Sequence, residues 1–230
     1  MNEMKIKTFA YILYVFAAAM LAIYFAAEII PDFFLSTAGR LVFLCGCCVF
    51  LWLGGFVLTK ITGSNKPMKI NLWIFLGLYL LLFATLTLFD PMWGRNGGFD
   101  VLWTKELFEA YTENSLNLVP FRTIAEYFVK NDLRQFAVNI AGNIVCLMPL
   151  GILLPLLSKK QNRAPVFLAT CTAIVVAVEC LQFLTLAGSC DIDDVILNVA
   201  GAFLVFCVVQ NAKINKALKF IFILEKDERK

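Results

Sequence analysis

The sequence predicts an all-α integral membrane protein with six transmembrane helices, and three observations support this fold class. Of the 230 residues, 60% are hydrophobic and 16% charged, whereas a soluble domain has about 45–50% apolar and about 25% charged residues. The mean hydropathy is +0.79. The apolar runs are long and lack the alternation over about 10 residues that marks strands of a membrane barrel. We therefore expect a multi-pass protein whose partner is the lipid bilayer rather than nucleic acid.

Six apolar runs are candidates to cross the hydrocarbon core, which requires about 20 mostly apolar residues. The first run follows two lysines, but it is longer than the about 7–15 apolar residues of a signal peptide, so we expect an uncleaved anchor. The last run is short, and neighbouring residues on both sides can extend it. The predicted spans are Phe9–Ile30, Leu41–Thr59, Ile70–Phe89, Phe136–Leu157, Pro165–Ala187 and Val195–Gln210.

The distribution of charge predicts the orientation of the chain. Loops rich in Lys and Arg stay in the cytoplasm. Fourteen of the twenty basic residues lie before the first span, between spans two and three, between spans four and five, or after the sixth. The other loops hold six basic residues and eleven acidic ones. We therefore expect a cell-membrane protein with both termini in the cytoplasm and the acidic loops outside.

A long external loop, residues 90–135, separates the third and fourth spans. Its stretch "NLVPFRTIAEYFVKNDL" predicts an extended segment followed by a short helix, with Pro120 at the first helical position. This helix has one apolar face, the pattern of a helix that lies among lipid headgroups. A partially ordered surface helix is the alternative. The residues of the apolar face are Phe121, Ile124 and Phe128.

The cysteines favour neither a disulfide framework nor a zinc site. Seven of the eight lie inside the apolar runs, where a free thiol acts as a small hydrophobic side chain. Only Cys190 falls in a predicted loop. The chain has no histidine, and the group Cys45, Cys47 and Cys48 is embedded in a span, so we do not expect zinc.

Polar side chains within the last three spans predict a shared site. Ionisable groups inside a span are rare, because each costs roughly 2.5–3.5 kcal/mol on insertion scales. The predicted topology puts these polar groups at similar depth in the external half of the membrane. If the three helices pack together, the groups line one polar pocket that opens to the outside. They are Asn139, Asn143, Glu179, Gln182, Asp191, Asp194 and Asn198.

These groups also have structural interpretations. The two asparagines of the fourth span can form hydrogen bonds between helices. Asp191 can be the N-cap of the sixth span, where the helix dipole also favours Asp193 and Asp194. Glu179 is harder to explain in this way, because a carboxyl group at that depth must be neutral, paired or in a wet cavity.

Four dispersed motifs resemble the VanZ-like family: "NLVPF", "NIAGNIVCLMPLG", "VECLQF" and "CDIDDVILNVAGAF". The resemblance covers about residues 72–209. It implies an N-terminal two-span extension (1–69), a VanZ-like membrane domain (70–212) and a basic cytoplasmic tail (213–230). It also implies signature positions at Asn117, Pro120, Phe121, Asn139, Asn143, Pro149, Gly151, Glu179, Gln182, Asp191, Asp194, Asn198 and Gly201.

The chain departs from this family in one respect. Many members carry an arginine shortly before the acidic segment, where this chain has "LAGSC". We expect Arg122 or Arg134 of the long loop to act as the basic partner instead. The resemblance implies a link to low-level resistance to teicoplanin, a glycopeptide antibiotic that acts at the outer membrane face and the cell wall, and it implies no particular reaction.

Three functions remain open, and we favour the first. A non-enzymatic protein would bind an amphiphilic ligand, such as a lipid-linked cell-wall precursor or a lipoglycopeptide, in the polar pocket without a cofactor. An enzyme would use Glu179 as acid or base and would hold Mg²⁺ or Ca²⁺ on Asp191, Asp193 and Asp194, although an EF-hand pattern and a nucleophile are missing. A small transporter is less consistent with a sequence that shows no inverted repeat and no paired broken helices.

Overall fold

The computed structural model describes residues 3–30, 33, 35–88, 103–130 and 133–224. Within them, six helical segments are long and apolar enough to cross a membrane, which confirms the predicted class of all-α polytopic membrane protein. The contacts divide the chain into two compact units, Met1–Leu78 with Ala212–Lys230, and Tyr79–Asn211. The six segments are Glu3–Ala27, Thr37–Thr62, Lys66–Leu88, Asn139–Leu157, Ala164–Leu184 and Ile192–Val209.

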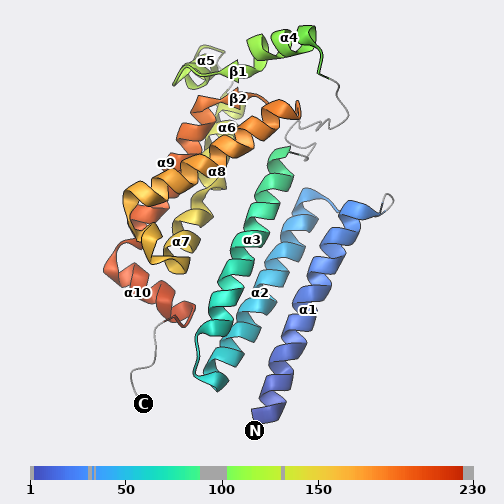
Figure 1. The fold of residues 1–230 in the computed structure, drawn as a ribbon, viewed down its shortest axis with the longest axis vertical. Coiled ribbons are helices and arrows are strands. Elements are labelled where there is room, and N and C mark those ends of the chain that lie inside the picture. The colour runs from blue at the N-terminus through green and yellow to red at the C-terminus, as the bar shows by residue number, and fades with distance from the viewer. Residues whose placement is uncertain (1–2, 31–32, 34, 89–102, 131–132, 225–230) are drawn as a thin grey trace. The chain divides into compact units, whose positions relative to one another are not determined.

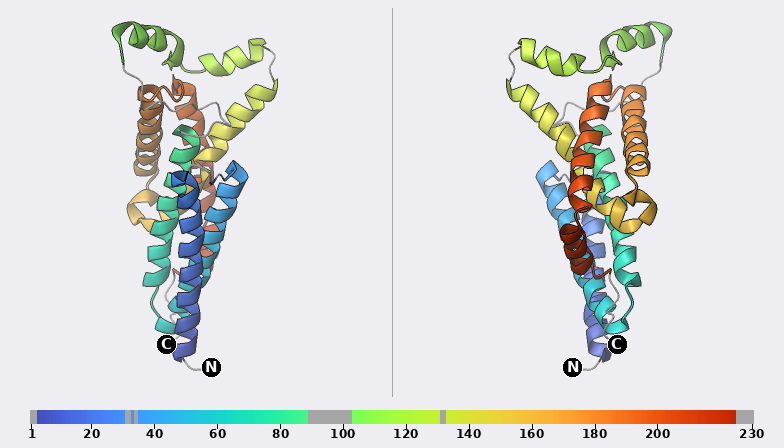
Figure 2. Two further views of the ribbon diagram at one scale, coloured as in Figure 1. Left: turned by 90° about the vertical axis from the view of Figure 1, so that its right-hand side faces the viewer. Right: turned by 90° about the vertical axis from the view of Figure 1, so that its left-hand side faces the viewer.

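The first unit is built on a pair of helices that lie side by side, α1 (Glu3–Ile29) and α2 (Thr37–Thr62) (Figures 1 and 2). It also contains the first part of α3 (Lys66–Leu88) and α10 (Ala212–Ile221). Helix α2 ends at Gly63, whose φ of 64° is the left-handed conformation that glycine adopts without strain.

Asn71 of α3 connects three helices of this unit. Its side-chain amide donates to the Tyr14 hydroxyl of α1 at 3.1 Å and to the Leu51 carbonyl oxygen of α2. A Cβ atom at Gly55 would collide with this amide. Glycine at that position therefore leaves room for a buried polar contact, which replaces the hydration that the amide loses inside the membrane.

The second unit is arranged around α9. This helix packs against three others, α6, α7 and α8 (Figure 1). The two short helices α4 and α5 lie across the end of the unit at which α9 begins (Figure 2). The elements of the unit after α3 are α4 (Lys105–Ser115), β1 (Leu116–Asn117), α5 (Arg122–Lys130), α6 (Leu133–Cys146), α7 (Met148–Leu157), η2 (Lys159–Asn162), α8 (Ala164–Leu184), β2 (Cys190–Asp191) and α9 (Ile192–Val209).

The fourth span is broken at Leu147, where the sequence predicted one continuous helix. Pro149 has no N–H for the helical ladder. The Leu150 N–H then bonds to the Leu147 carbonyl at 3.1 Å instead of to the Cys146 carbonyl. The Tyr79 hydroxyl donates to the Cys146 carbonyl. A side chain from α3 thus satisfies a backbone group that the break exposes, as the interior of a membrane protein requires.

Two glycines allow α9 to approach both halves of the broken span. A Cβ atom at Gly201 of α9 would collide with the Ile144 carbonyl oxygen of α6. A Cβ atom at Gly151 of α7 would lie 2.6 Å from the Ala202 carbonyl oxygen of α9. Small residues at such contacts are typical of helices that pack closely in membranes.

The described part of the long loop contains two helices, whereas the sequence predicted one. The unpredicted helix, α4, begins after Thr104, whose hydroxyl accepts the Leu107 N–H at 3.2 Å. The predicted helix is present as α5, but it begins at Arg122 rather than at Pro120. Phe121 has a φ of 65° and so lies outside the helix. The side chain of Phe128 is outside the described part of the structure.

Candidate functional site

The long loop and the start of α9 are joined by two very short strands. Strands β1 and β2 pair in parallel, with Asn117 opposite Asp191. The Asn117 amide donates to Asp191 Oδ1 at 2.9 Å, although 74 residues separate them. The hydroxyl of Thr123 donates to the other oxygen, Asp191 Oδ2. The first and last of the four sequence motifs therefore meet at this point.

Asp191 is the N-cap of α9, as the structural interpretation predicted. Its Oδ1 accepts the backbone N–H of Asp193 at 2.8 Å, which satisfies a donor at the helix start. Its own N–H donates to Glu179 Oε2 of α8 at 3.1 Å. The side chains of Glu179, Asp191 and Asp193 are all buried. Glu179 thus contributes to the fixed geometry at the head of the last span.

Asp193 caps a helix other than its own. Its carboxylate accepts the N–H of Phe121 and, at 3.2 Å, the N–H of Ile124. These N–H groups at the start of α5 have no acceptor within the helix. These two bonds hold Phe121 in its left-handed conformation, which costs a non-glycine residue about 1–2 kcal/mol. The same loop presents apolar side chains that are each more than half exposed: Leu118, Val119 and Phe121.

The amides of α6 and α9 form a second group of hydrogen bonds, which begins at Asp194 next to Asp193 in the chain. Asn143 Nδ2 donates to the Asp194 carboxylate. Asn198 Nδ2 donates to Asn143 Oδ1 at 3.2 Å and to the Asp194 carbonyl at 2.9 Å. These directional bonds fix the orientation of both amides. Asn198 is 3% exposed, and its Oδ1 has no donor among the described residues.

Two of the predicted pocket residues form their bonds elsewhere. Asn139 donates to the Tyr127 hydroxyl of α5, and Gln182 donates to the Thr87 carbonyl of α3 at 2.8 Å. The other six are bonded in two groups at the head of α9: Asn117, Asp191 and Glu179, and Asn143, Asp194 and Asn198.

Of the two arginines proposed as basic partners for Glu179 or the aspartates, the structure describes the side chain of Arg122 alone. Arg122 Nε donates to Glu126 Oε1 at 3.1 Å, one turn along the exposed side of α5. The side chain of Arg134 lies outside the described part of the structure.

The oxygens of Asp191 and Asp193 face hydrogen-bond donors. Each carboxyl group accepts at least two N–H or O–H groups. A Mg²⁺ or Ca²⁺ ion would need the same carboxylate oxygens as its ligands. In the residues that the structure describes, no group of three His, Cys, Asp or Glu side chains is placed to hold a metal ion.

Sequence reasoning missed several contacts of the long loop. The Tyr111 hydroxyl donates to the Gly188 carbonyl at 2.6 Å, and the Trp103 indole donates to the Leu184 carbonyl at 3.2 Å. Both rings also contact Phe183. The Thr104 cap was a local signal for α4, but nothing near Thr123 in the sequence indicates its bond to Asp191.

Cys190 lies at the edge of this network. It belongs to β2, between two spans, and is partly exposed. Burial raises the pKa of its thiol, and the neighbouring carboxylate of Glu179 raises that pKa further. The group is therefore a weak nucleophile at neutral pH.

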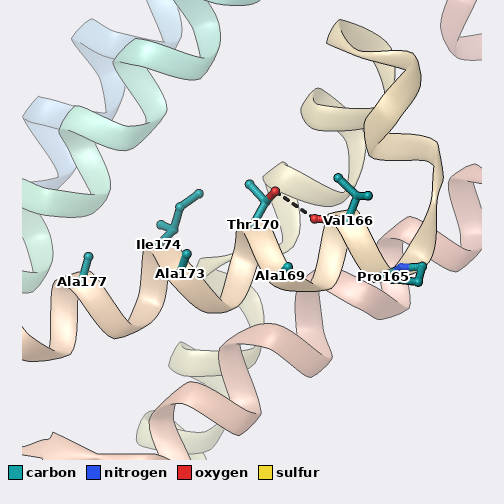
Figure 3. A pocket seen from close by; sticks show the side chains of 7 residues that line it. All are labelled: Pro165, Val166, Ala169, Thr170, Ala173, Ile174 and Ala177. Carbon is teal, nitrogen blue, oxygen red and sulfur yellow. Dashed lines mark hydrogen bonds between the residues drawn. The ribbon is translucent and has the colours of Figure 1, made fainter.

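An open groove found elsewhere in the unit is apolar. It runs along one face of α8, where the Thr170 hydroxyl is bonded to the Val166 carbonyl at 2.9 Å (Figure 3). None of the predicted polar residues lines it. Its lining residues are Pro165, Val166, Ala169, Thr170, Ala173, Ile174 and Ala177.

Comparisons with known proteins identify the family of this chain. The VanZ/LLP1 family matches residues 73–213. Protein VanZ of Enterococcus faecium is 30% identical over 129 residues, which are 56% of this chain and 67% of the relative. No solved structure matches this chain. The matched region holds the α6–α9 core and the network at the head of α9, and the chain belongs to the VanZ/LLP1 family.

Proposed function

We propose that this chain binds an amphiphilic, envelope-associated ligand at the network around the head of α9 and thereby alters susceptibility to glycopeptides such as teicoplanin. The ligand class is a lipid-linked cell-wall precursor or a lipoglycopeptide. In the orientation predicted from charge, this end of α9 faces the outside of the cell membrane, where both kinds of molecule occur.

The observation that carries the proposal is the buried acceptor Asn198 Oδ1. Leaving a buried polar atom unsatisfied costs about 1–3 kcal/mol, and such atoms call for an unseen partner. A hydroxyl or amide N–H of a ligand supplies the missing donor. The bonds of Asn143 and Asp194 hold this acceptor in place.

The apolar loop beside the network supports an amphiphilic ligand. Leu118, Val119 and Phe121 expose apolar surface and are held next to the network by Asn117 and Asp193. A polar head at the buried amide and an apolar chain along this loop would match both features. Because donors occupy the oxygens of Asp191 and Asp193, we favour binding over metal-assisted chemistry.

Two leucine variants distinguish the role of Asn198 Oδ1 from the role of the bonds that position it. Asn198→Leu removes Oδ1 and keeps the number and branching of the side-chain heavy atoms, whereas Asn143→Leu breaks the Asn143–Asn198 bond and leaves Oδ1 in place. Purified native protein and both variants are tested for thermal stabilisation by teicoplanin and by a lipid-linked wall precursor, with and without Mg²⁺. Cells that express each protein are tested for teicoplanin susceptibility.

We expect Asn198→Leu to lose ligand stabilisation and resistance, and Asn143→Leu to keep part of both. Retention of both by Asn198→Leu would contradict the proposal. Turnover of the precursor that requires Mg²⁺ would favour the enzyme instead.

A further inference from the structure

The C-terminal helix α10 has two chemically distinct faces. Lys213, Lys216 and Lys219 recur at every third position and share one face. The opposite face is an apolar stripe at spacings of four and three residues: Ile214, Leu218 and Ile221. A short helix with this pattern is typical of the membrane–water boundary.

Protein covers the apolar stripe only in part. No residue of α10 is buried, and Ile214 and Ile221 remain 39% and 46% exposed. Phe220, which lies on the lysine face, is 79% exposed. The helix therefore needs a further apolar contact if this surface is to leave water.

The connection to α9 places the start of α10 at the membrane boundary. Helix α9 ends at Val209 and α10 begins at Ala212. The two intervening residues reach at most roughly 7 Å when extended. The start of α10 thus lies near the point where the last span leaves the hydrocarbon core.

A second group of lysines lies near the far end of α10. The Asn65 amide, in the turn after α2, donates to the Leu224 carbonyl at 3.1 Å, and the Trp52 indole of α2 donates to the Ile221 carbonyl at 3.3 Å. The exposed lysines around that turn are Lys60, Lys66 and Lys69.

The segments that carry these two groups of lysines contain no acidic residues to balance the positive charge. Residues 53–72 and 210–224 contain six lysines and no acidic residue, and residues 225–230 add three acids and three bases. Anionic lipid headgroups are the complementary partner for such a surface, since juxtamembrane lysines are attracted to anionic leaflets.

We propose that α10 is an anionic-lipid-binding helix that lies in the leaflet at the carboxyl end of α9. Its apolar stripe enters the boundary between headgroups and acyl chains. The stems of Lys213, Lys216 and Lys219 extend along the helix so that their ammonium groups reach lipid phosphates. None of the residues of this surface belongs to the network at the head of α9.

Hydrogen exchange of the full-length protein in nanodiscs tests the proposal. Amide exchange in residues 212–221 is compared between phosphatidylcholine discs and discs with phosphatidylglycerol, at low and high salt. The test variant carries Lys213→Gln, Lys216→Gln and Lys219→Gln. Its matched control, Lys5→Gln with Lys159→Gln and Lys160→Gln, removes the same charge elsewhere, and glutamine preserves helix propensity.

We expect α10 to exchange more slowly with phosphatidylglycerol, by about fivefold per lysine engaged, and high salt to reduce the effect. The test variant should lose the protection, and the control should keep it, with exchange in α8 unchanged in both. Equal protection in the two lipids would overturn the proposal, as would an unaffected test variant. Equal loss in the control would show a nonspecific charge effect, and protection by inorganic phosphate alone would exclude the lipid as the source.

Discussion

The carboxylate of Asp193, at the start of α9, accepts the backbone N–H of Ile124 at 3.2 Å and so stabilises a helix that lies outside the spans. Asp193 is 1% exposed. Its neighbour two residues earlier caps α9. The acidic segment therefore begins one helix and anchors another, and it fixes the long loop over the end of the α6–α9 core.

Replacement of Asp193 should free the start of α5. In Asp193→Ala, the N–H groups of Phe121 and Ile124 lose their acceptor, at an expected cost of about 2 kcal/mol in the free energy of unfolding. Hydrogen exchange should become faster at the first turn of α5 and stay constant in α8. The exposed Glu109→Ala serves as a control. Unchanged exchange at Ile124 would show that the cap does not hold the loop.

Asn143 and Asn198 should be energetically coupled. The leucine variants of these residues and their double variant form a cycle, and hydrogen bonds between membrane helices average about 0.6 kcal/mol of coupling. Chemical unfolding in mild detergent measures it. Asn139→Leu with Asn198→Leu is the matched control, because Asn139 bonds to Tyr127 instead. That pair should be additive, and equal coupling in both cycles would indicate a general effect of polarity.

The close approach of α9 to α6 should depend on Gly201. In Gly201→Ala, the new Cβ meets the Ile144 carbonyl, which is backbone and cannot move aside, so we expect a loss of about 3 kcal/mol. Gly142→Ala in α6 is the matched control, since nothing lies within 4 Å of its Cβ position. It should change stability by less than about 1 kcal/mol. Thermal unfolding of both variants measures the difference, and similar melting temperatures would refute the close contact.

The hydroxyl of Tyr79 should stabilise the break in the fourth span. Tyr79→Phe leaves the Cys146 carbonyl without its donor, at an expected cost of about 1–3 kcal/mol. Tyr11→Phe, on the exposed side of α1, is the control. Chemical unfolding measures both. An unchanged free energy of unfolding in Tyr79→Phe would mean that water or a backbone donor bonds to the Cys146 carbonyl instead.

Labelling of Cys190 by an impermeant thiol reagent should be slow at neutral pH and faster as the pH rises. Its raised pKa leaves little thiolate at pH 7, and only the thiolate reacts. Cys190→Ser identifies the signal, because the other cysteines lie within helices of the spans. Labelling in intact cells also tests the orientation: reaction only after the membrane is opened would place the head of α9 inside. A rate independent of pH between 7 and 9 would contradict the raised pKa.

Local patterns of the sequence were sufficient to predict the spans, the short helix α5 and most polar residues of the network. Hydropathy is a local property, and lipid excludes unpaired backbone groups, so a long apolar run has to be a helix. The N-cap at Asp191 is also local, because it bonds to a backbone group only two residues away. Helix α10 had a readable amphipathic pattern, but its basic residues led only to the prediction of a charged tail.

The tertiary structure alone decided which polar groups meet. Nothing within a few residues of Asp193 indicates that its carboxylate caps α5, and nothing near Cys146 indicates a hydroxyl from α3. Gln182 lies one helical turn from Glu179, and Asn139 lies one turn from Asn143, so the sequence predicted a shared site for each pair. Gln182 instead bonds to Thr87, and Asn139 bonds to Tyr127. The physical reason is that depth in the membrane follows from position along each helix, whereas hydrogen-bond partners depend on the rotation and close packing of helices far apart in the chain.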